Sequence, residues 1–383
     1  MANEPIRVLR IMGPVISGGV DIITMNYYRA INKEKVQLDF IFDGYHKTSI
    51  DDEVKEMGGK IFKVEPYTSS MWKSMKQVYQ IVKENDYQIV HSHMNALSVF
   101  PLCAAKLAGA KVRIASNHST ATKGETKKTV LKYMLRPLAK VFPTHFAACS
   151  KHAGHWLFGK EFCESGKVSF IKNAIDLKKY HFSEEVRTNV RAELDVSDKF
   201  VIGHAGRFAY QKNHKFIVET FEEVVKVHPN SVLLLAGDGP LKPEIESLVK
   251  EKGLDDKVRF LGVRRDINRI MQAFDVFLFP SFYEGLGNVI TEAQAVSTIS
   301  IVSEGIPDEV RFTEYVVGMN LSQTAKEWAR EVLKYKDNYT RRDTKQDMRN
   351  NGYDIDLAAE QLVDYYIELN KHLPNKELVK GEI

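Results

Sequence analysis

Short apolar runs alternate with stretches of helical periodicity along nearly the whole chain. In the first half, the runs predict strands at residues 6–12, 36–42, 60–64, 87–93, 111–116, 144–150 and 168–173, with helical patterns near 19–32, 70–85, 95–108, 126–141 and 150–159. Alternation of this kind predicts a doubly wound α/β fold with a parallel sheet.

The alternation stops once and then restarts. Residues 176–198 are charged and polar, which indicates a connection between two domains. Further strands are predicted at residues 200–206, 231–237, 258–262, 275–281 and 298–302. A chain of 383 residues is long enough for each of two domains to bury its own core. We therefore expect two Rossmann-like domains, at residues 1–180 and 181–354, which face each other across a cleft.

Composition narrows the class of protein. Hydrophobic residues make up 44% of the chain and charged residues 27%, as in soluble globular proteins. We see neither an apolar run long enough to span a membrane nor a signal peptide. The cysteines, Cys103, Cys149 and Cys163, lack the spacing of a disulfide or zinc framework. These features predict a cytoplasmic protein with reduced thiols.

Positive charge is concentrated in the first half of the chain. Lys and Arg outnumber Asp and Glu by 27 to 16 in residues 1–180, whereas Asp and Glu outnumber them by 34 to 27 in residues 181–383. A basic half indicates an anionic partner, which could be nucleic acid, a membrane surface or a phosphorylated substrate.

Residues 279–295 predict a nucleotide-sugar site. An apolar strand ends at Pro280, a loop carries Glu284, and a helical pattern follows. The amides of this turn, in Gly285, Leu286, Gly287 and Asn288, could bind a pyrophosphate at the helix start. Glu284 could then hold sugar hydroxyls, and Glu292 the ribose diol. Two glutamates at this spacing are more often a solvated helix face, but the carboxyl end of a parallel strand favours a ligand site.

Arg207 and Lys212 follow the first predicted strand of the second domain. A guanidinium and an ammonium on one loop can neutralise a diphosphate leaving group. An isolated pair of this kind would be read as ordinary surface charge. Its position in the same sheet as the Glu284 turn favours the functional interpretation.

Three glycine-containing turns are weaker candidates for nucleotide contacts. The pair Gly18 and Gly19 follows the first strand, but it does not form the GxGxxG pattern of dinucleotide-binding proteins. Gly237 and Gly239 end another strand, where ordinary turn chemistry explains them equally well. The backbone of Val263 and Arg264, on the same rim, could contact the base.

The histidines near predicted strand ends allow two interpretations. His91, His93 and His118 could suggest a metal, but no Asp or Glu accompanies them, so no metal site is predicted. His118 fits better as a hydrogen-bond partner for a substrate hydroxyl or phosphate.

Residues 123–142 form a basic amphipathic stretch. Lysines such as Lys128 and Lys132 are set among apolar residues such as Val130 and Met134. The stretch could lie on an anionic membrane surface or near a lipid-diphosphate substrate, or it could be an ordinary helix packed on its own domain.

Together, these motifs resemble the retaining family-4 glycosyltransferases of the GT-B fold, especially those of bacterial exopolysaccharide and capsule assembly. The likeness covers nearly the whole chain. It implies that Arg207 and Lys212 hold the donor diphosphate, that Glu284 binds the donor sugar, and that His118 touches the transferred sugar. It also implies that the Gly18-Gly19 loop lies against phosphate and acceptor, and that a final helix, here 355–372, returns to the first domain.

The resemblance implies a metal-independent transfer of a sugar, with retention, from a nucleotide diphosphate such as UDP to a glycan or polyprenyl-diphosphate-linked acceptor. Two alternatives stay open. A nucleotide-sugar epimerase on the same fold would need no acceptor. A basic, non-catalytic protein that binds membrane or nucleic acid would explain the charge, but the basic residues lack interleaved aromatics and any nucleic-acid motif, so no nucleic-acid partner is expected. The expected location is the cytoplasm, with the inner face of the membrane as an alternative.

Overall fold

The computed structural model describes residues 4–13, 19–48, 50–119, 126–336 and 338–373. It divides into two compact units. The first contains the chain up to Ala174 and from Ile355 onward, and the second runs from Ile175 to Asp354. The division falls before the predicted boundary at residue 180, because Ile175 already pairs with Asp354 inside the second unit.

The first unit is built on a seven-stranded parallel sheet in the order β3-β2-β1-β4-β5-β6-β7. Its strands are β1 (Ile6–Ile11), β2 (Val36–Asp43), β3 (Ile61–Val64), β4 (Ile89–Ser92), β5 (Val112–Asn117), β6 (His145–Ala148) and β7 (Val168–Phe170). Its helices are α1 (Gly19–Ala30), α2 (Asp51–Glu56), α3 (Tyr67–Glu84), η1 (Asn95–Ser98), α4 (Val99–Leu107), α5 (Thr126–Leu135), η2 (Arg136–Lys140), α6 (Lys151–Phe158), α7 (Lys160–Glu164) and α15 (Ile355–Lys371). The seven predicted strands each coincide with one of these.

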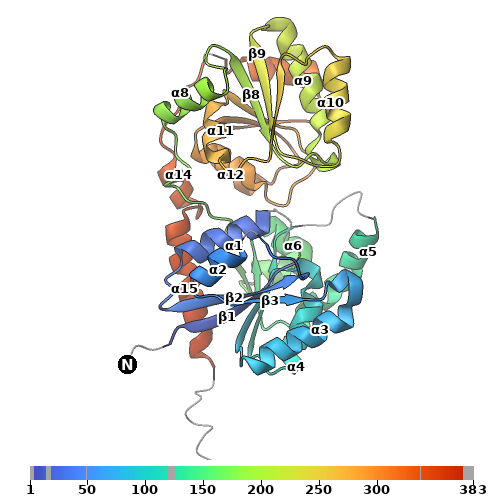
Figure 1. Cartoon of the computed structure of the whole chain (residues 1–383), viewed down its shortest axis with the longest axis vertical. Helices are drawn as coiled ribbons and strands as arrows, with labels where there is room; N and C mark the ends of the chain where they lie inside the picture. The colour runs from blue at the N-terminus through green and yellow to red at the C-terminus, as the bar shows by residue number, and fades with distance from the viewer. Residues whose placement is uncertain (1–3, 14–18, 49, 120–125, 337, 374–383) are drawn as a thin grey trace, which may run out of the picture. The chain divides into compact units, whose positions relative to one another are not determined.

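Helices cover both faces of this sheet (Figure 1). On one face, Val8 and Leu38 of the sheet pack with residues of α1, α2 and α15, among them Leu362. On the other face, Val90 packs with residues of α3, α4 and α6, among them Leu102. Because both faces are buried, most strand positions are apolar, with Arg10 in β1 and Asp39 in β2 among the exceptions.

The second unit contains a six-stranded parallel sheet in the order β10-β9-β8-β11-β12-β13. Its strands are β8 (Phe200–Ala205), β9 (Ser231–Ala236), β10 (Val258–Gly262), β11 (Val276–Phe279), β12 (Ile299–Ser303) and β13 (Val316–Met319). Its helices are α8 (Glu184–Glu193), η3 (Tyr210–Lys212), α9 (His214–Val227), α10 (Lys242–Glu251), α11 (Ile267–Ala273), α12 (Asn288–Ala295), η4 (Asp308–Val310), α13 (Ala325–Leu333) and α14 (Lys345–Asn350). The edge strand β13 was not predicted, because its four residues are only partly buried or exposed and include a glycine.

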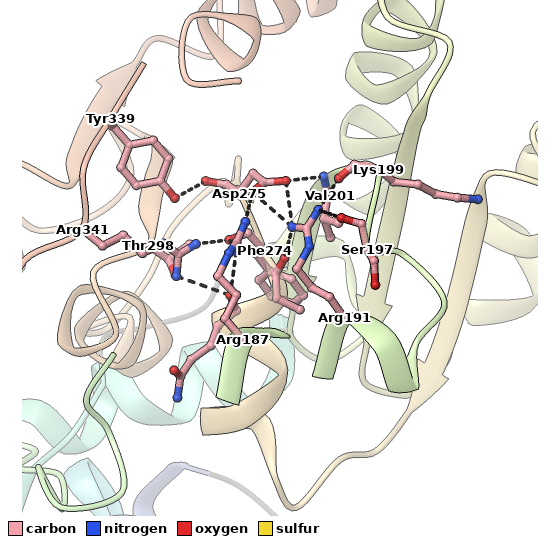
Figure 2. A network of polar contacts seen from close by, with 12 residues as sticks. Arg187, Arg191, Ser197, Lys199, Val201, Phe274, Asp275, Thr298, Tyr339 and Arg341 are labelled. Atoms are coloured by element: carbon pink, nitrogen blue, oxygen red, sulfur yellow. Dashed lines mark hydrogen bonds and ion pairs between the residues drawn. The ribbon is translucent and has the colours of Figure 1, made fainter. Parts of the chain in front are cut away.

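The stretch 176–198, predicted as a connection, contains α8 and belongs to the second unit. Arg187 and Arg191 of α8 both bind the carboxylate of Asp275, the residue before β11 (Figure 2). The same carboxylate accepts a hydrogen bond of 2.7 Å from the amide of Val201 in β8. The charged residues of this stretch therefore anchor a helix to the amino ends of two strands.

The strand order of the second unit creates a switch point at the opposite, carboxyl edge. The chain leaves β8 toward β9 on one side, whereas β11 lies on the other side of β8. Loops that leave neighbouring strands in opposite directions open a crevice, and open α/β sheets bind ligands there. The loops after β8 and β11 carry Lys212 and Glu284.

Among the described residues, none of the helices combines the length and the apolar character needed to cross a membrane.

Candidate functional site

The loops after β8 and β11 are joined by an ion pair. Nζ of Lys212 lies 2.7 Å from Oε1 of Glu284. Their side chains are 16% and 7% exposed, so the pair is largely shielded from water. Nζ of Lys212 also lies 4.5 Å from the ring centroid of Phe279, at the end of β11. The structure thus brings together two of the residues that the sequence singled out separately.

Two neighbours that the sequence analysis missed hold these loops in place. The backbone amide of Phe282 donates to the carbonyl of Gln211 at 2.9 Å, and Nε2 of Gln211 donates to the carbonyl of Tyr283 at 2.9 Å. Nδ2 of Asn213 donates to the carbonyl of Pro280 at 3.2 Å. Asn213 has φ of 56°, a left-handed conformation that asparagine tolerates better than most residues. In the sequence, the only indication of this role is that Asn213 directly follows Lys212, a predicted site residue.

Arg207 differs from Lys212 in its surroundings. It lies on the same loop, is exposed, and has no hydrogen-bond or ion-pair partner within the described part of the chain. A guanidinium without an internal partner keeps its planar set of donors for an oxyanion.

The turn before α12 presents backbone donors. Gly287 caps the helix in a left-handed conformation, with φ of 75°. The amides of Gly285, Leu286 and Gly287 donate to no backbone acceptor among the described residues, as expected for groups at a helix start. Asn288 is the first residue of the helix. This arrangement, close to Glu284, is suited to an anion.

Glu292 lies in the second turn of α12. Its partner, Tyr180, was not identified from the sequence. Tyr180 is hydrogen-bonded to the Glu292 carboxyl group. Burial raises the pKa of Glu292 to about 7, and the bond from Tyr180 opposes that rise. Near neutral pH, Glu292 therefore exchanges between an acid and a carboxylate that could accept hydroxyl groups.

Gly237 and Gly239 have a structural explanation. A Cβ on Gly237 would lie 2.1 Å from the carbonyl oxygen of Gly206, and one on Gly239 would lie 2.5 Å from that of Phe208. These glycines let the loop after β9 pack directly against the loop that carries Arg207. Their contact with a nucleotide stays a prediction.

Gly305, in the loop after β12, has a similar role that the sequence analysis did not identify. A Cβ there would lie 2.6 Å from the carbonyl oxygen of Phe282, and the Gly305 carbonyl accepts from the amide of Glu284 at 3.2 Å. The glycine thus supports the Glu284 turn from behind.

Val263 and Arg264 follow β10 at the same edge. Val263 is 71% exposed. Nε and Nη2 of Arg264 donate to the Asp266 carboxylate at 2.8 and 2.7 Å, so its side chain is already engaged. A contact with a base would therefore involve the exposed Val263 or the backbone.

In the first unit, His118 lies directly after β5. Its amide donates to Oδ1 of Asn95 at 2.7 Å, and its Nε2 lies 2.9 Å from Nδ1 of His93. Burial, and secondarily the charge of Arg10, lowers the pKa of His118 to about 4. It is therefore a neutral hydrogen-bonding group at pH 7. Gly19 begins α1, whereas Gly18 lies outside the described residues.

The amphipathic stretch 123–142 forms α5 and η2, and its first residues lie outside the described part. Several apolar side chains are exposed here, among them Val130, Met134 and Val141 at 57%, 69% and 54%. Leu135 and Ala139 are buried. The stretch is thus packed on one side and leaves an apolar surface on the other.

Comparisons with known proteins agree with this architecture. Residues 17–179 match the family model described as Glycosyltransferase Family 4, and residues 186–355 match that described as Glycosyl transferases group 1. EpsF of Bacillus subtilis (strain 168), which is named as a glycosyltransferase, is 33% identical over 344 residues, covering 87% of this chain and 88% of that protein.

Two further proteins are informative. A UDP-Gal:alpha-D-GlcNAc-diphosphoundecaprenol alpha-1,3-galactosyltransferase of Escherichia coli is 31% identical over 241 residues, covering 60% of this chain and 61% of that protein. The structure of Anabaena HepE in complex with UDP-glucose is similar with a TM-score of 0.72 and 17% identity, over 96% of this chain and 100% of that one. The chain therefore belongs to the glycosyltransferases of the GT-B fold that combine a family 4 domain with a group 1 domain.

Proposed function

We propose that this glycosyltransferase moves a sugar from UDP to a glycan or a lipid-diphosphate-linked acceptor, with retention of configuration, in the synthesis of an extracellular polysaccharide. The observation that carries the proposal is the ion pair of Lys212 and Glu284 at the switch point of the second sheet. A fixed cation and a fixed carboxylate there suit a donor that has a diphosphate at one end and a hydroxyl-rich sugar at the other.

The chemistry would be catalysis of leaving-group departure. As the bond from the sugar C1 to the diphosphate oxygen breaks, negative charge grows on the diphosphate. Arg207, Lys212 and the amides of Gly285 to Gly287 would stabilise it without reorganising. The acceptor hydroxyl would form the new bond to C1 from the same face, and its proton would pass to the departing diphosphate.

Donor and acceptor classes are supported by similar proteins. The Escherichia coli relative is named for UDP-Gal and a diphosphoundecaprenol-linked acceptor, and HepE was solved with UDP-glucose. The resemblance to exopolysaccharide and capsule enzymes supports the polysaccharide role.

We also propose that the transfer needs no metal. Two protein cations and the start of α12 would supply the positive charge that a divalent ion provides in other nucleotide-sugar sites. Activity that persists in excess EDTA is expected, and a requirement for Mg²⁺ or Mn²⁺ would contradict this point.

Thermal denaturation with UDP, GDP, ADP and their sugars tests the donor. A ligand of the native protein raises Tm by mass action, so UDP and one UDP-sugar should protect most. The matched variant Lys212→Met should lose this protection. Equal protection by all nucleotides in both proteins would contradict a UDP-specific site.

Finally, we propose that residues 123–142 attach the protein to an anionic membrane surface. The exposed apolar side chains of α5 and η2, next to Lys132 and Arg136, support this proposal because interfacial helices combine these features.

A further inference from the structure

Arg10 is a buried arginine in the centre of the first sheet. It lies in β1 and is 3% exposed. One hydrogen bond joins it to the hydroxyl of Tyr366 in α15. Its Nε and Nη1 have no hydrogen-bond partner among the described residues. A guanidinium in this position loses the stabilisation of water without gaining that of an anion.

A small pocket lies against this guanidinium. Arg10 lines it together with His93 and His118, which follow β4 and β5, and with Lys172 and Asn173. The cavity volume is about 20 Å³, enough for one small polar group. Neighbouring parallel strands thus direct polar side chains to one point near their carboxyl ends.

The pocket is positively charged. No Asp or Glu lines it within the described part of the chain. Burial is the main cause that lowers the pKa of His93 well below its usual value, and the charge of Arg10 is the second. Burial also lowers the pKa of His118. Both imidazoles are therefore neutral at pH 7, and Arg10 supplies the charge.

His93 adds a second unused polar atom. Its Nδ1 is engaged with His118, whereas its Nε2 is buried without a partner among the described residues. Water in the pocket could satisfy individual N–H groups, but it would not neutralise the charge. An oxyanion would do both, because carboxylate and phosphoryl oxygens form charge-assisted bonds with guanidinium N–H groups.

We propose that this pocket binds an oxyanion group, a carboxylate or a phosphoryl group, of the acceptor. Its volume of about 20 Å³ corresponds to about one water-sized group, so it would admit an oxygen of the charged group and leave the remainder of the acceptor outside. The assignment to the acceptor rests on the proposed function, whereas the oxyanion site itself does not.

The first experiment measures Tm of the full-length protein with inorganic phosphate, glucose 6-phosphate and glucuronate, at constant ionic strength. At about five times Kd, an oxyanion that binds the pocket should raise Tm by about 2–4 °C. Arg10→Met should abolish this rise, whereas Arg330→Met, at an exposed arginine of the second unit, should retain it. Without added anion, Arg10→Met should melt no lower than the wild type, because it removes an uncompensated buried charge.

The three probes separate the sources of the oxyanion. A stronger response to glucose 6-phosphate or glucuronate than to phosphate supports a group carried by a sugar acceptor, whereas an equal response to phosphate would overturn that assignment and leave a free-ion site. If Arg10→Met does not fold, Arg10→Lys should bind the best probe at least about tenfold more weakly, because it loses the planar fork. Absence of saturable binding to the wild type in calorimetry, for all three probes, would overturn the site.

A parallel titration with UDP distinguishes this inference from the proposed function. UDP should protect Arg10→Met as well as it protects the wild type. If UDP fails to protect either protein, the proposed donor is wrong while the oxyanion results still stand. If Arg10→Met loses protection by UDP as well, Arg10 belongs to the donor site and the acceptor assignment is wrong.

Discussion

The ammonium group of Lys212 and the carboxylate of Glu284 are 2.7 Å apart, although 72 positions separate them in the sequence. Their loops leave adjacent strands in the second unit, β8 and β11. Each group neutralises the other in a place where water hardly reaches. A donor diphosphate would therefore approach a cation that is already positioned, and the carboxylate would be left to accept hydroxyl groups.

Lys212→Met should reduce both activity and stability. We expect kcat to fall by about 10²–10³-fold, as for loss of a group that stabilises a developing oxyanion. The free energy of unfolding should fall by about 3 kcal/mol, because Glu284 would stay buried without its partner. Turnover assays and urea denaturation measure the two effects.

The double variant Lys212→Met/Glu284→Gln is the matched control for that experiment. It should recover most of the lost stability, since no unpaired charge is left, but none of the activity. If the single and double variants unfold at the same urea concentration, the pair does not contribute to stability as proposed. Near-normal turnover in either variant would show that the site is placed wrongly.

Arg207→Met should separate activity from stability. Because Arg207 is exposed and makes no contact with a partner in the described structure, its removal should leave Tm within about 1 °C of the wild type. Turnover should nevertheless fall about 10²-fold if the guanidinium binds the diphosphate. Arg330→Met, at another exposed arginine, should change neither quantity; a similar loss of turnover there would point to a nonspecific charge effect.

The affinity for UDP should depend on pH through Glu292. Burial raises the pKa of this carboxyl group to about 7 from a usual value of 4.5. A carboxylate can accept bonds from both hydroxyls of a ribose, whereas the acid can accept fewer. We expect UDP to bind more tightly as pH rises from 6 to 8, and binding near pH 7 to release a proton. Calorimetry in buffers of different ionisation enthalpy measures both.

Glu292→Gln provides the control, because UDP itself titrates in this range. The part of the pH dependence of UDP affinity that is lost in the variant is due to Glu292. If wild type and variant show the same pH dependence, Glu292 does not bind the ribose.

The raised pKa of Glu292 also affects stability. Between pH 4.5 and 7 the folded protein holds a proton that the unfolded chain has released, so the contribution of Glu292 to stability falls as pH rises through that window.

Much of the fold could be predicted because parallel strands that are buried on both faces are rich in apolar residues. The predicted strands in residues 1–180 and 200–302 all occur, whereas β13 was missed because it is short and partly exposed. The stretch 176–198 was misread as a connection. Its charged residues suggested solvent, but Arg187 and Arg191 are used to bind a buried carboxylate far along the chain.

The site could be predicted only in part, for a similar reason. Lys212 and Glu284 were identifiable because charged residues after apolar strands indicate the edge where ligands bind. Gln211 and Asn213 were not, because their role depends on backbone carbonyls of a loop about 70 residues away. Arg10 was not identified, because it lies within a predicted strand. The local sequence does not show that this arginine is buried without a carboxylate partner.

Asp275→Asn should destabilise the second unit strongly. Its carboxylate accepts bonds from Arg187, Arg191 and the amide of Val201 in a buried network (Figure 2). Loss of the charge leaves two guanidinium groups without their anion, for an expected cost of about 3 kcal/mol or more in the free energy of unfolding. Urea denaturation measures this change in the free energy of unfolding, independently of the turnover assay.

Glu314→Gln is a matched comparison for Asp275→Asn. Glu314 also binds an arginine, Arg342, with contacts of 2.6 and 2.7 Å, but on the surface. Exposed pairs of this kind contribute about 0–1 kcal/mol. Equal destabilisation by the two substitutions would mean that burial does not decide the strength of these contacts.

The membrane proposal predicts that the protein sediments with vesicles that contain an anionic phospholipid. Met134→Asp/Leu138→Asp, within the exposed apolar surface of α5 and η2, should abolish sedimentation, because it places two charges where apolar side chains would enter the interface. Leu107→Asp, at a 70% exposed leucine elsewhere in the first unit, is the control and should sediment like the wild type. High salt should weaken binding through Lys132 and Arg136, but less than the double substitution does, since the apolar contribution is not screened. Wild-type protein that stays in the supernatant would contradict the proposal directly; loss of binding in the Leu107 variant as well would mean that a general increase in negative charge, and not this surface, is responsible.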